Sequence, residues 1–249
     1  MERRKLITLA ALASGVSAVS PVWAAVDFGK VLQAGSDLGK SESLKDEDLK
    51  KYFDQMSADM DRRNKVAAAG SPYASRLNTL TSGLSRYDGL ALNYKVYLTP
   101  QVNAFAMANG TVRIYSGLMD KFTDDEVRYV IGHEIGHVKS GHTKARMQTA
   151  LRTSALRNAV GAAGGTAGTI ADSQLGALFE QVVKSQHSQK NEHEADDYSM
   201  RFMKKNKYSA QACVTALDKL AAMSGGESSW LSTHPSPKER SARMKTQVG

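Results

Sequence analysis

Two histidines and a glutamate form the part of the sequence best suited to chemistry. Residues 133–137 read His-Glu-Ile-Gly-His, so His133 and His137 are four positions apart. Four residues of an α-helix advance slightly more than one turn, which places the two imidazoles about 40° apart on one face, where they can bind one metal ion. Glu134 is offset by about 100° from His133, beside the metal and not bound to it. That position suits a base for metal-bound water.

A catalytic zinc site needs a third protein ligand and one open position. The metzincin continuation is absent, because Ser140 and Thr143 stand where that pattern has a glycine and a histidine. His142 is one residue short of that spacing, so we interpret it as a surface or supporting residue.

A second predicted helix, residues 190–205, carries a better third ligand. Glu192 and Asp196 are four positions apart and share one face of this helix. Where the two helices cross, we expect Glu192 to reach the metal and Asp196 to accept a hydrogen bond from a metal-bound histidine or to position a neighbouring base. His193 is a rival ligand, and Glu194 and Asp197 are expected to face solvent. Taken alone, the segment favours an ordinary acidic surface over a ligand site.

The elements that must position these residues can be read from caps and periodicity. Thr123 to Glu126 form a capping box that opens a helix ending near Gly141. Along that helix, Gly132 and Gly136 offer an edge for close approach of another backbone. Further helices are predicted over 44–69, 73–86, 143–157, 172–187 and 209–224, with a short one after Pro237; three strands are predicted at Tyr94–Thr99, Asn103–Ala108 and Thr111–Ser116.

The predicted fold class is therefore α+β, mainly helical, with a small antiparallel β-sheet beside the His-Glu-x-x-His helix. Asn109-Gly110 between two of the strands is a strong hairpin signal. Residues 161–168 are small and glycine-rich, which favours a linker between helices and leaves open a mobile flap.

The N-terminus is typical of a secretory signal. A basic start at residues 2–5 precedes an apolar stretch at 6–19, and Val22-Trp23-Ala24 provides small residues for cleavage after Ala24. We expect a signal peptide at 1–24, a flexible lead-in at 25–43 and one domain at 44–249. The mature protein is expected to be periplasmic, soluble and not lipidated, without a transmembrane helix; the export route, Sec or twin-arginine, is left open.

Composition narrows the choice of partners. The 249 residues are 41% hydrophobic, and the net charge of +8 is spread over helical segments without an aromatic-interleaved basic patch, so no nucleic-acid partner is expected. Cys213 is the only cysteine, which excludes an internal disulfide.

The two motifs together resemble metallopeptidase family forty-eight, which includes the CAAX prenyl proteases, HtpX, the Oma-type proteases and periplasmic zinc metallopeptidases of the BepA and LoiP kind. The residues that carry the likeness are His-Glu-Ile-Gly-His at 133–137 and Glu-His-Glu-Ala-Asp at 192–196, and it covers about residues 45–245. The resemblance implies a gluzincin-type domain with one zinc ion per chain. In that case His133, His137 and Glu192 are the zinc ligands, Glu134 is the catalytic base and Asp196 the supporting acid.

The resemblance also implies roles for two further segments. Asn103–Ala106 is similar to the edge on which this family binds substrate. His234-Pro235 with Arg240 resembles a C-terminal H-P-x-x-x-x-R segment whose histidine can approach the zinc. From the residues alone His234 is a loop histidine; with the resemblance it becomes a catalytic-site residue that either blocks or assists the reaction.

The predicted function is zinc-dependent endopeptidase activity in the bacterial periplasm, directed at unfolded or misassembled envelope proteins. Self-inhibition is one of the two roles that the sequence leaves open for His234. The alternative is a chaperone-like module that binds outer-membrane proteins and carries a latent zinc site. A third, weaker interpretation is an acidic surface with no metal. Oligomeric state and the physiological substrate cannot be read from the sequence.

Overall fold

The computed structural model describes residues 46–153, 176, 178–179, 181–223 and 228–248. The predicted signal peptide, the lead-in and the glycine-rich segment 161–168 lie outside these residues. Of the predicted helix 172–187, residues 176, 178, 179, 181 and 182 are helical, and the chain leaves the helix by 183. Within the described residues, no helix has the length and apolar character needed to cross a membrane.

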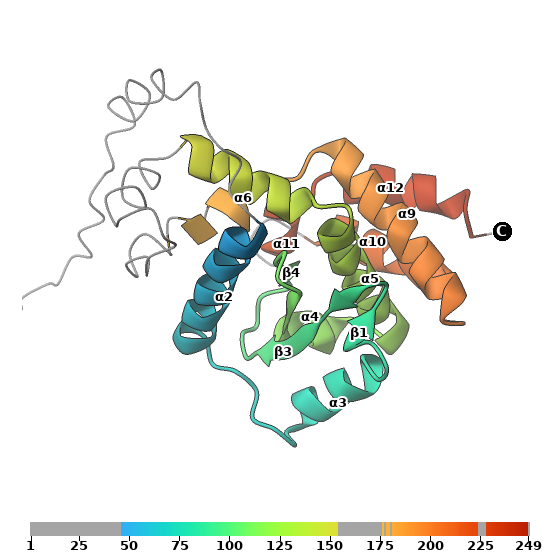
Figure 1. Cartoon of the computed structure of the whole chain (residues 1–249). Helices are drawn as coiled ribbons and strands as arrows, with labels where there is room; N and C mark the ends of the chain where they lie inside the picture. The colour runs from blue at the N-terminus through green and yellow to red at the C-terminus, as the bar shows by residue number, and fades with distance from the viewer. Residues whose placement is uncertain (1–45, 154–175, 177, 180, 224–227, 249) are drawn as a thin grey trace, which may run out of the picture.

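The helix α5, Asp124–Lys139, lies at the centre of the molecule (Figure 1). It begins with the predicted capping box: the Thr123 backbone N–H donates to Glu126 Oε2 at 2.8 Å, and the Glu126 N–H donates to Thr123 Oγ1 at 3.4 Å. These two bonds satisfy donors that a helix N-terminus leaves unpaired. The start of the helix that carries His133 and His137 is thus fixed by local sequence.

A three-stranded sheet packs against α5. Its strands are β3 (Asn93–Tyr97), β4 (Ala104–Ala106) and β5 (Thr111–Tyr115), in the order β3-β5-β4. β4 and β5 form the predicted antiparallel hairpin, and Gly110 takes the positive φ of 85° that its turn requires. The prediction of an antiparallel sheet is wrong for β3, which pairs with β5 in parallel. β3 is not joined to β5 by a hairpin, because the chain first passes to the far edge of β5 to form β4.

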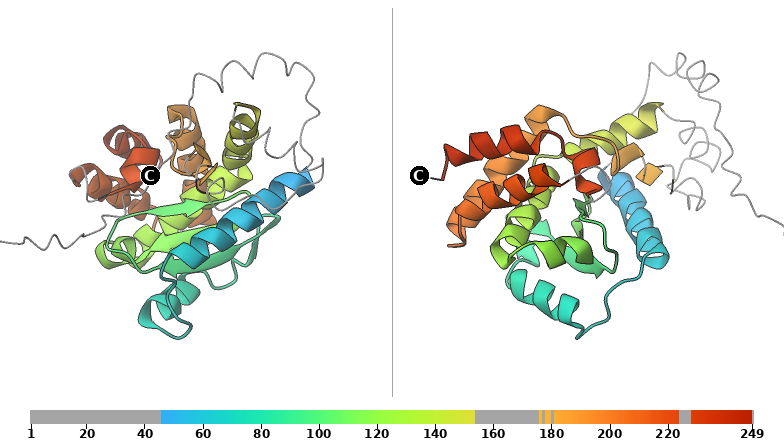
Figure 2. Two further views of the ribbon diagram at one scale, coloured as in Figure 1. Left: turned by 90° about the vertical axis from the view of Figure 1, so that its left-hand side faces the viewer. Right: turned by 180° about the vertical axis from the view of Figure 1, so that it is seen from behind.

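The two faces of this sheet are covered by different helices (Figure 2). Alternate residues of a strand point to opposite faces. Val112 and Ile114 of β5 belong to the cluster shared with α5, whereas Tyr115 belongs to the cluster shared with α2, Asp46–Arg63. A separate two-stranded antiparallel ribbon, β1 (Arg86–Tyr87) with β2 (Leu90–Ala91), precedes the sheet in the chain.

The remaining helices confirm a mainly helical fold. They are α3 (Pro72–Leu80), α4 (Ser116–Lys121), α6 (His142–Thr153), α9 (Gln189–Lys205), α10 (Gln211–Ala222), α11 (Trp230–Thr233) and α12 (Pro237–Lys245). Two helices end earlier than predicted. α2 stops at Arg63 because the following residues join the sheet: the Ala67 N–H donates to the Val96 carbonyl at 2.9 Å. α3 stops at Leu80, ahead of strand β1.

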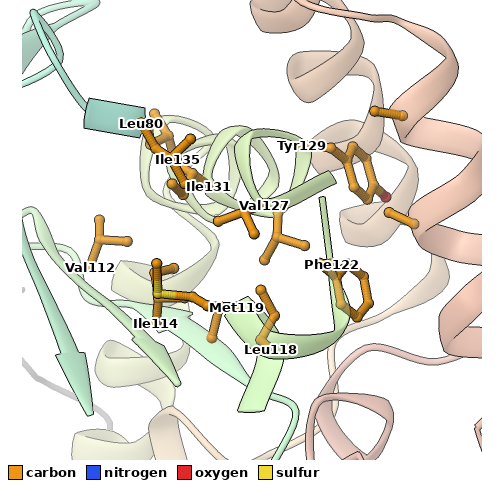
Figure 3. Packing of buried hydrophobic residues seen from close by; sticks show 14 of the residues in the cluster. Leu80, Val112, Ile114, Leu118, Met119, Phe122, Val127, Tyr129, Ile131 and Ile135 are labelled. Carbon is orange, nitrogen blue, oxygen red and sulfur yellow. The ribbon is translucent and has the colours of Figure 1, made fainter. Parts of the chain in front are cut away.

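Apolar residues along one face of α5 form much of the core (Figure 3). Val127, Ile131 and Ile135 are fully buried and pack with residues of the sheet and of α4. On another edge of α5, a Cβ added to Gly132 would lie 2.7 Å from Ser199 Oγ, and one added to Gly136 would lie 3.1 Å from the Ala195 backbone. Glycine at these two positions therefore lets α9 approach α5 closely enough for their side chains to meet.

Candidate active site

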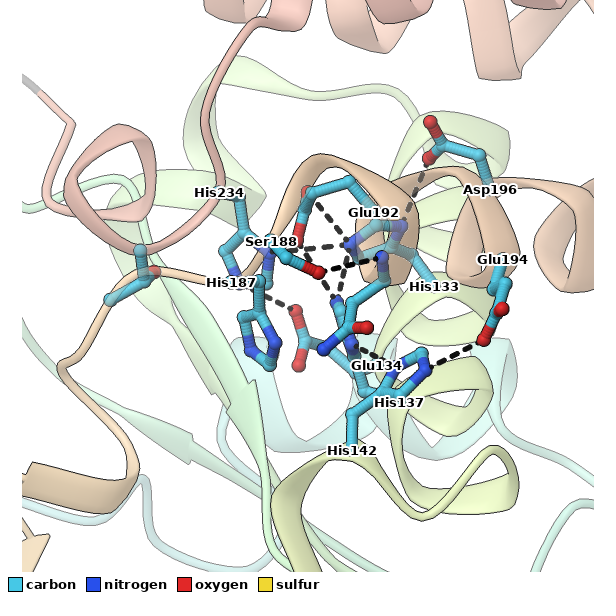
Figure 4. A network of polar contacts seen from close by, with 12 residues as sticks. His133, Glu134, His137, His142, His187, Ser188, Glu192, Glu194, Asp196 and His234 are labelled. Atoms are coloured by element: carbon cyan, nitrogen blue, oxygen red, sulfur yellow. Dashed lines mark hydrogen bonds and ion pairs between the residues drawn. The ribbon is translucent and has the colours of Figure 1, made fainter. Parts of the chain in front are cut away.

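The close contact of α5 with α9 brings the predicted ligand residues together (Figure 4). His133 Nε2 and His137 Nε2 are 3.0 Å apart. Glu192 Oε1 lies 3.3 Å from His137 Nε2, and Glu192 Oε2 lies 3.6 Å from His133 Nε2. All three side chains are buried. The single turn of α5 and the first turn of α9 therefore direct two imidazoles and one carboxylate to one point.

These residues fit a metal ion. Ligand atoms of His133, His137, Glu192 and His234 all lie within 4.8 Å of one another. Glu192 Oε1 faces the histidines, 3.3 Å from His137 Nε2 and 3.0 Å from His234 Nδ1, whereas Oε2 is paired with Arg240. Two imidazoles and a carboxylate are a ligand set found in catalytic zinc sites. His193, the rival ligand, is not part of this group.

Asp196 lies behind His133 in a buried polar network. Its Oδ1 is 3.0 Å from His133 Nδ1 and accepts from the Tyr129 hydroxyl at 2.7 Å. Arg240 binds both carboxylate oxygens, through Nε at 2.8 Å and Nη2 at 2.7 Å. The Arg240 guanidinium is fully buried and also forms an ion pair with Glu192. One arginine from α12 thus pairs with two carboxylates of α9 and offsets part of their charge.

This electrostatic arrangement keeps the ligand groups in the protonation states that metal binding needs. Burial alone would raise the pKa of Glu192, but the charges of His234 and Arg240 outweigh it and hold this pKa well below its usual range. Burial likewise opposes ionisation of Asp196, and the Arg240 charge again lowers the pKa. Burial lowers the pKa of His137, so this imidazole is neutral. Carboxylates and neutral imidazoles are the forms that bind zinc.

Glu134 also lies in the cluster, but its partners come from the C-terminal segment. Trp230 Nε1 donates to Glu134 Oε1 at 3.3 Å, and His234 Nε2 is 3.4 Å from the same oxygen. Both Glu134 and Trp230 are buried. The carboxylate is therefore next to the ligand group without belonging to it, as the helical offset predicted.

His234 takes a position that the residues alone did not predict. It follows α11, and its Nδ1 lies 3.0 Å from Glu192 Oε1 and 3.3 Å from His133 Nε2. Its ring stacks on Trp230 with centroids 4.2 Å apart. The segment that resembles H-P-x-x-x-x-R thus adds a fourth side chain to the ligand group.

Several residues of the site escaped the sequence analysis. His187, which precedes α9, stacks on His137 with ring centroids 3.8 Å apart and contacts Arg146 of α6. Burial lowers the pKa of His187, which keeps it neutral. Glu194, expected to face solvent, binds His142 although its side chain is 44% exposed. Five of the six histidines in the sequence therefore lie at or beside the site, and His193 is the exception.

A histidine pair one helical turn apart, a carboxylate from a crossing helix and a buried glutamate beside them define the site of a metallopeptidase. Comparison with known proteins agrees with this class. Residues 62–248 match the model of peptidase family M48. The chain therefore belongs to peptidase family M48, and it is a metalloendopeptidase.

Three relatives illustrate the extent of the likeness. The chain is 44% identical to the metalloprotease LoiP of Escherichia coli over 225 residues, which are 90% of this chain and 89% of LoiP. It is 39% identical to the metalloprotease YcaL of the same organism, with the same coverage. With the β-barrel assembly-enhancing protease of Escherichia coli it shares 32% identity over 160 residues, 59% of this chain and 32% of that protein.

Proposed function

We propose that this metalloendopeptidase uses zinc, bound by His133, His137 and Glu192, to hydrolyse polypeptides of the bacterial envelope. The observation that carries the proposal is the convergence of three buried ligand atoms from α5 and α9 beside Glu134. Catalytic zinc in proteins has three such ligands and one open position. His234 points to the position that would otherwise be open.

The chain's own residues have distinct tasks in this reaction. Zinc, when bound, lowers the pKa of water to about 7 and polarises the scissile carbonyl. Glu134 accepts the proton of the attacking water on its carboxylate and delivers it to the leaving nitrogen. Asp196 accepts a hydrogen bond from the Nδ1–H of His133 and so holds the ring with its other nitrogen directed at the ligand group.

The outer edge of β4, the one not paired with β5, is suited to bind an extended substrate. In the antiparallel pairing with β5, the Met107 N–H bonds to the Thr111 carbonyl and the Tyr115 N–H bonds to the Asn103 carbonyl. The peptide groups of Ala104 and Ala106, at alternate positions, therefore point away from β5. In this conformation the Ala104 N–H donates to Asn103 Oδ1 at 2.9 Å and the Ala106 carbonyl accepts from Thr143 Oγ1 at 3.5 Å, and a substrate strand would replace these bonds. A substrate strand that pairs with them is held by its main chain, which accepts many sequences.

In the conformation described, the protein's own C-terminal segment contacts the residue that leads into this edge and also enters the site. The Trp230 N–H donates to the Val102 carbonyl at 3.2 Å, on the free side of the strand that leads into β4. The Trp230 indole binds Glu134, and His234 lies in the ligand group. We therefore propose that residues 228–234 inhibit the enzyme until they move.

Location and substrates are proposed from the sequence and one relative. The basic start, apolar stretch and cleavage residues at 1–24 support export to the periplasm, followed by a lead-in at 25–43 and the peptidase domain at 44–249. A relative is named for enhancing β-barrel assembly, which supports unfolded or misassembled outer-membrane proteins as substrates.

Replacement of the proposed base tests the proposal. Glu134→Gln keeps the size of the side chain and removes its capacity to accept a proton, so casein cleavage should fall by about 100-fold or more while zinc content stays at one ion per chain. Exposed Glu47 of α2 provides the control variant Glu47→Gln, which should cleave like the wild type. Undiminished cleavage by Glu134→Gln with zinc bound removes Glu134 from the mechanism.

The buried position of His234 favours one alternative, a quality-control module that binds outer-membrane proteins with its zinc latent. The variant His234→Ala separates the two functions. A large gain in casein cleavage supports the self-inhibited peptidase, because the fourth ligand position has been opened. No cleavage by either form, together with tight binding of an unfolded outer-membrane protein, supports the binding module.

A further inference from the structure

The two histidines of α5 both face the ligand group through Nε2, which leaves Nδ1 of each ring for another partner. For His133 that partner is Asp196, discussed above. For His137 it is a second histidine: His137 Nδ1 lies 2.9 Å from His142 Nδ1. The rings meet edge to face, with centroids 5.1 Å apart. His142 therefore contacts the side of His137 that is turned away from Glu192.

His142 is held in this position by the chain around it. α5 ends at Lys139, Gly141 adopts a positive φ of 72°, and His142 is the first residue of α6. This reversal turns the His142 side chain back onto the last turn of α5, where it is 7% exposed. Its second nitrogen, Nε2, lies 2.9 Å from Glu194 Oε2 on α9. Three elements thus meet in a chain of contacts from His137 through His142 to Glu194 (Figure 4).

One arrangement of protons satisfies all these contacts. His137 must keep the lone pair of Nε2 for the ligand group, so its proton is on Nδ1. That N–H donates to His142 Nδ1, which must then be unprotonated. His142 consequently carries its proton on Nε2 and donates it to the Glu194 carboxylate. The opposite tautomer of His142 would set two N–H groups against each other at 2.9 Å and a lone pair against a carboxylate.

We propose that His142 and Glu194 are positioning residues for His137, which fix its tautomer and ring orientation so that Nε2 is presented to the metal. This inference rests on the proposed zinc site. This pair orients the His137 ring as Asp196 orients the His133 ring, with the difference that the His142 imidazole lies between His137 and the carboxylate of Glu194. Because the Glu194 side chain is 44% exposed whereas Asp196 is fully buried, the contribution of Glu194 is the smaller of the two.

Zinc affinity, measured by competition with a chromophoric chelator, tests the inference without relying on activity. His142→Leu fills the space but offers no acceptor, and we expect zinc binding to weaken about 10- to 100-fold, as for other partners of metal-bound histidine. His142→Asn places an amide oxygen near the position of Nδ1 and should restore affinity to within about threefold of the wild type. Glu194→Gln should weaken binding by about threefold, and the control Glu47→Gln should not change it.

The tautomer of His142 in the wild-type protein gives a second measurement, which does not depend on how a variant folds. Nitrogen-15 spectra of the zinc-loaded protein should show His142 protonated on Nε2 and His137 on Nδ1. An Nδ1-protonated His142, or His142→Leu with wild-type zinc affinity, overturns the inference while leaving the zinc site intact. A wild-type protein that binds no zinc overturns both this inference and the proposed function.

Discussion

The fully buried guanidinium of Arg240 offers the sharpest prediction about stability. Arg240 binds both oxygens of Asp196 and forms an ion pair with Glu192, and the side chains of all three are inaccessible to solvent. Arg240→Met keeps much of the aliphatic length and removes the charge. Two carboxylates would then remain buried without their cation.

The expected loss is large because of this burial. Removal of one partner of a buried ion pair costs about 3–5 kcal/mol, since the remaining charge is left without compensation in a medium that solvates it poorly. Arg243 lies one turn away on the same helix and binds Asp197 at 2.6 Å, but these two side chains are 32% and 33% exposed. Arg243→Met should therefore cost only about 0–1 kcal/mol. The difference between the two variants isolates the effect of burial.

Urea unfolding at neutral pH, followed by circular dichroism, measures both variants in the presence of a chelator and again with saturating zinc. Zinc should recover part of the loss in Arg240→Met, because the metal compensates Glu192 but not Asp196. The conservative Arg240→Lys should fall between wild type and Arg240→Met, since it keeps the charge and loses the two-pronged contact. The reasoning is refuted if Arg240→Met unfolds at the same urea concentration as Arg243→Met.

Three further predictions concern the supports of the site. Thr123→Ala removes the side-chain cap of α5 and should lower the free energy of unfolding by about 1 kcal/mol in urea titrations; a change below about 0.3 kcal/mol would contradict the role of the cap. Gly136→Ala places a Cβ 3.1 Å from the Ala195 backbone and should lower the free energy of unfolding by about 1–3 kcal/mol in the same titrations. Because α9 is displaced, zinc binding should also weaken in chelator competition. Unchanged zinc affinity would show that α9 tolerates the shift. Burial opposes the ionisation of Asp61, but its bonds to Arg113, Lys95 and Tyr97 outweigh this effect and lower its pKa in the folded protein. The ionised Asp61 therefore stabilises the fold at pH values above its pKa in the unfolded chain, which is about 4. This stabilisation is lost as the pH falls through the lower pKa of the folded protein. Urea midpoints of the wild type and Asp61→Asn should therefore differ most near pH 7 and converge below pH 4, and a constant difference would exclude this linkage.

The parts of the site that could be predicted from sequence are those governed by local rules. The cap at Thr123 and the spacing of His133 and His137 depend only on the geometry of one helix. Glu192 and Asp196 share a face of α9 for the same reason. That α9 would pack on α5 was signalled by Gly132 and Gly136, which leave an edge where another backbone can approach. Asn109-Gly110 likewise identified the β4–β5 hairpin.

The rest depends on where loops return in space, which periodicity does not encode. His187 precedes α9 and was placed inside a predicted helix, but it stacks on His137. Trp230 binds Glu134 from a helix of four residues that leaves no amphipathic pattern. The parallel pairing of β3 with β5 is a matter of chain path, because both directions present the same alternation of side chains.

The most direct measurement of the central claim is a crystal structure of the zinc-loaded protein with anomalous scattering recorded at the zinc edge. The account predicts one anomalous peak per chain, about 2.0–2.2 Å from His133 Nε2, His137 Nε2 and a carboxylate oxygen of Glu192. A peak elsewhere, or a Glu192 carboxylate that does not reach the ion held by the two histidines, would contradict the account.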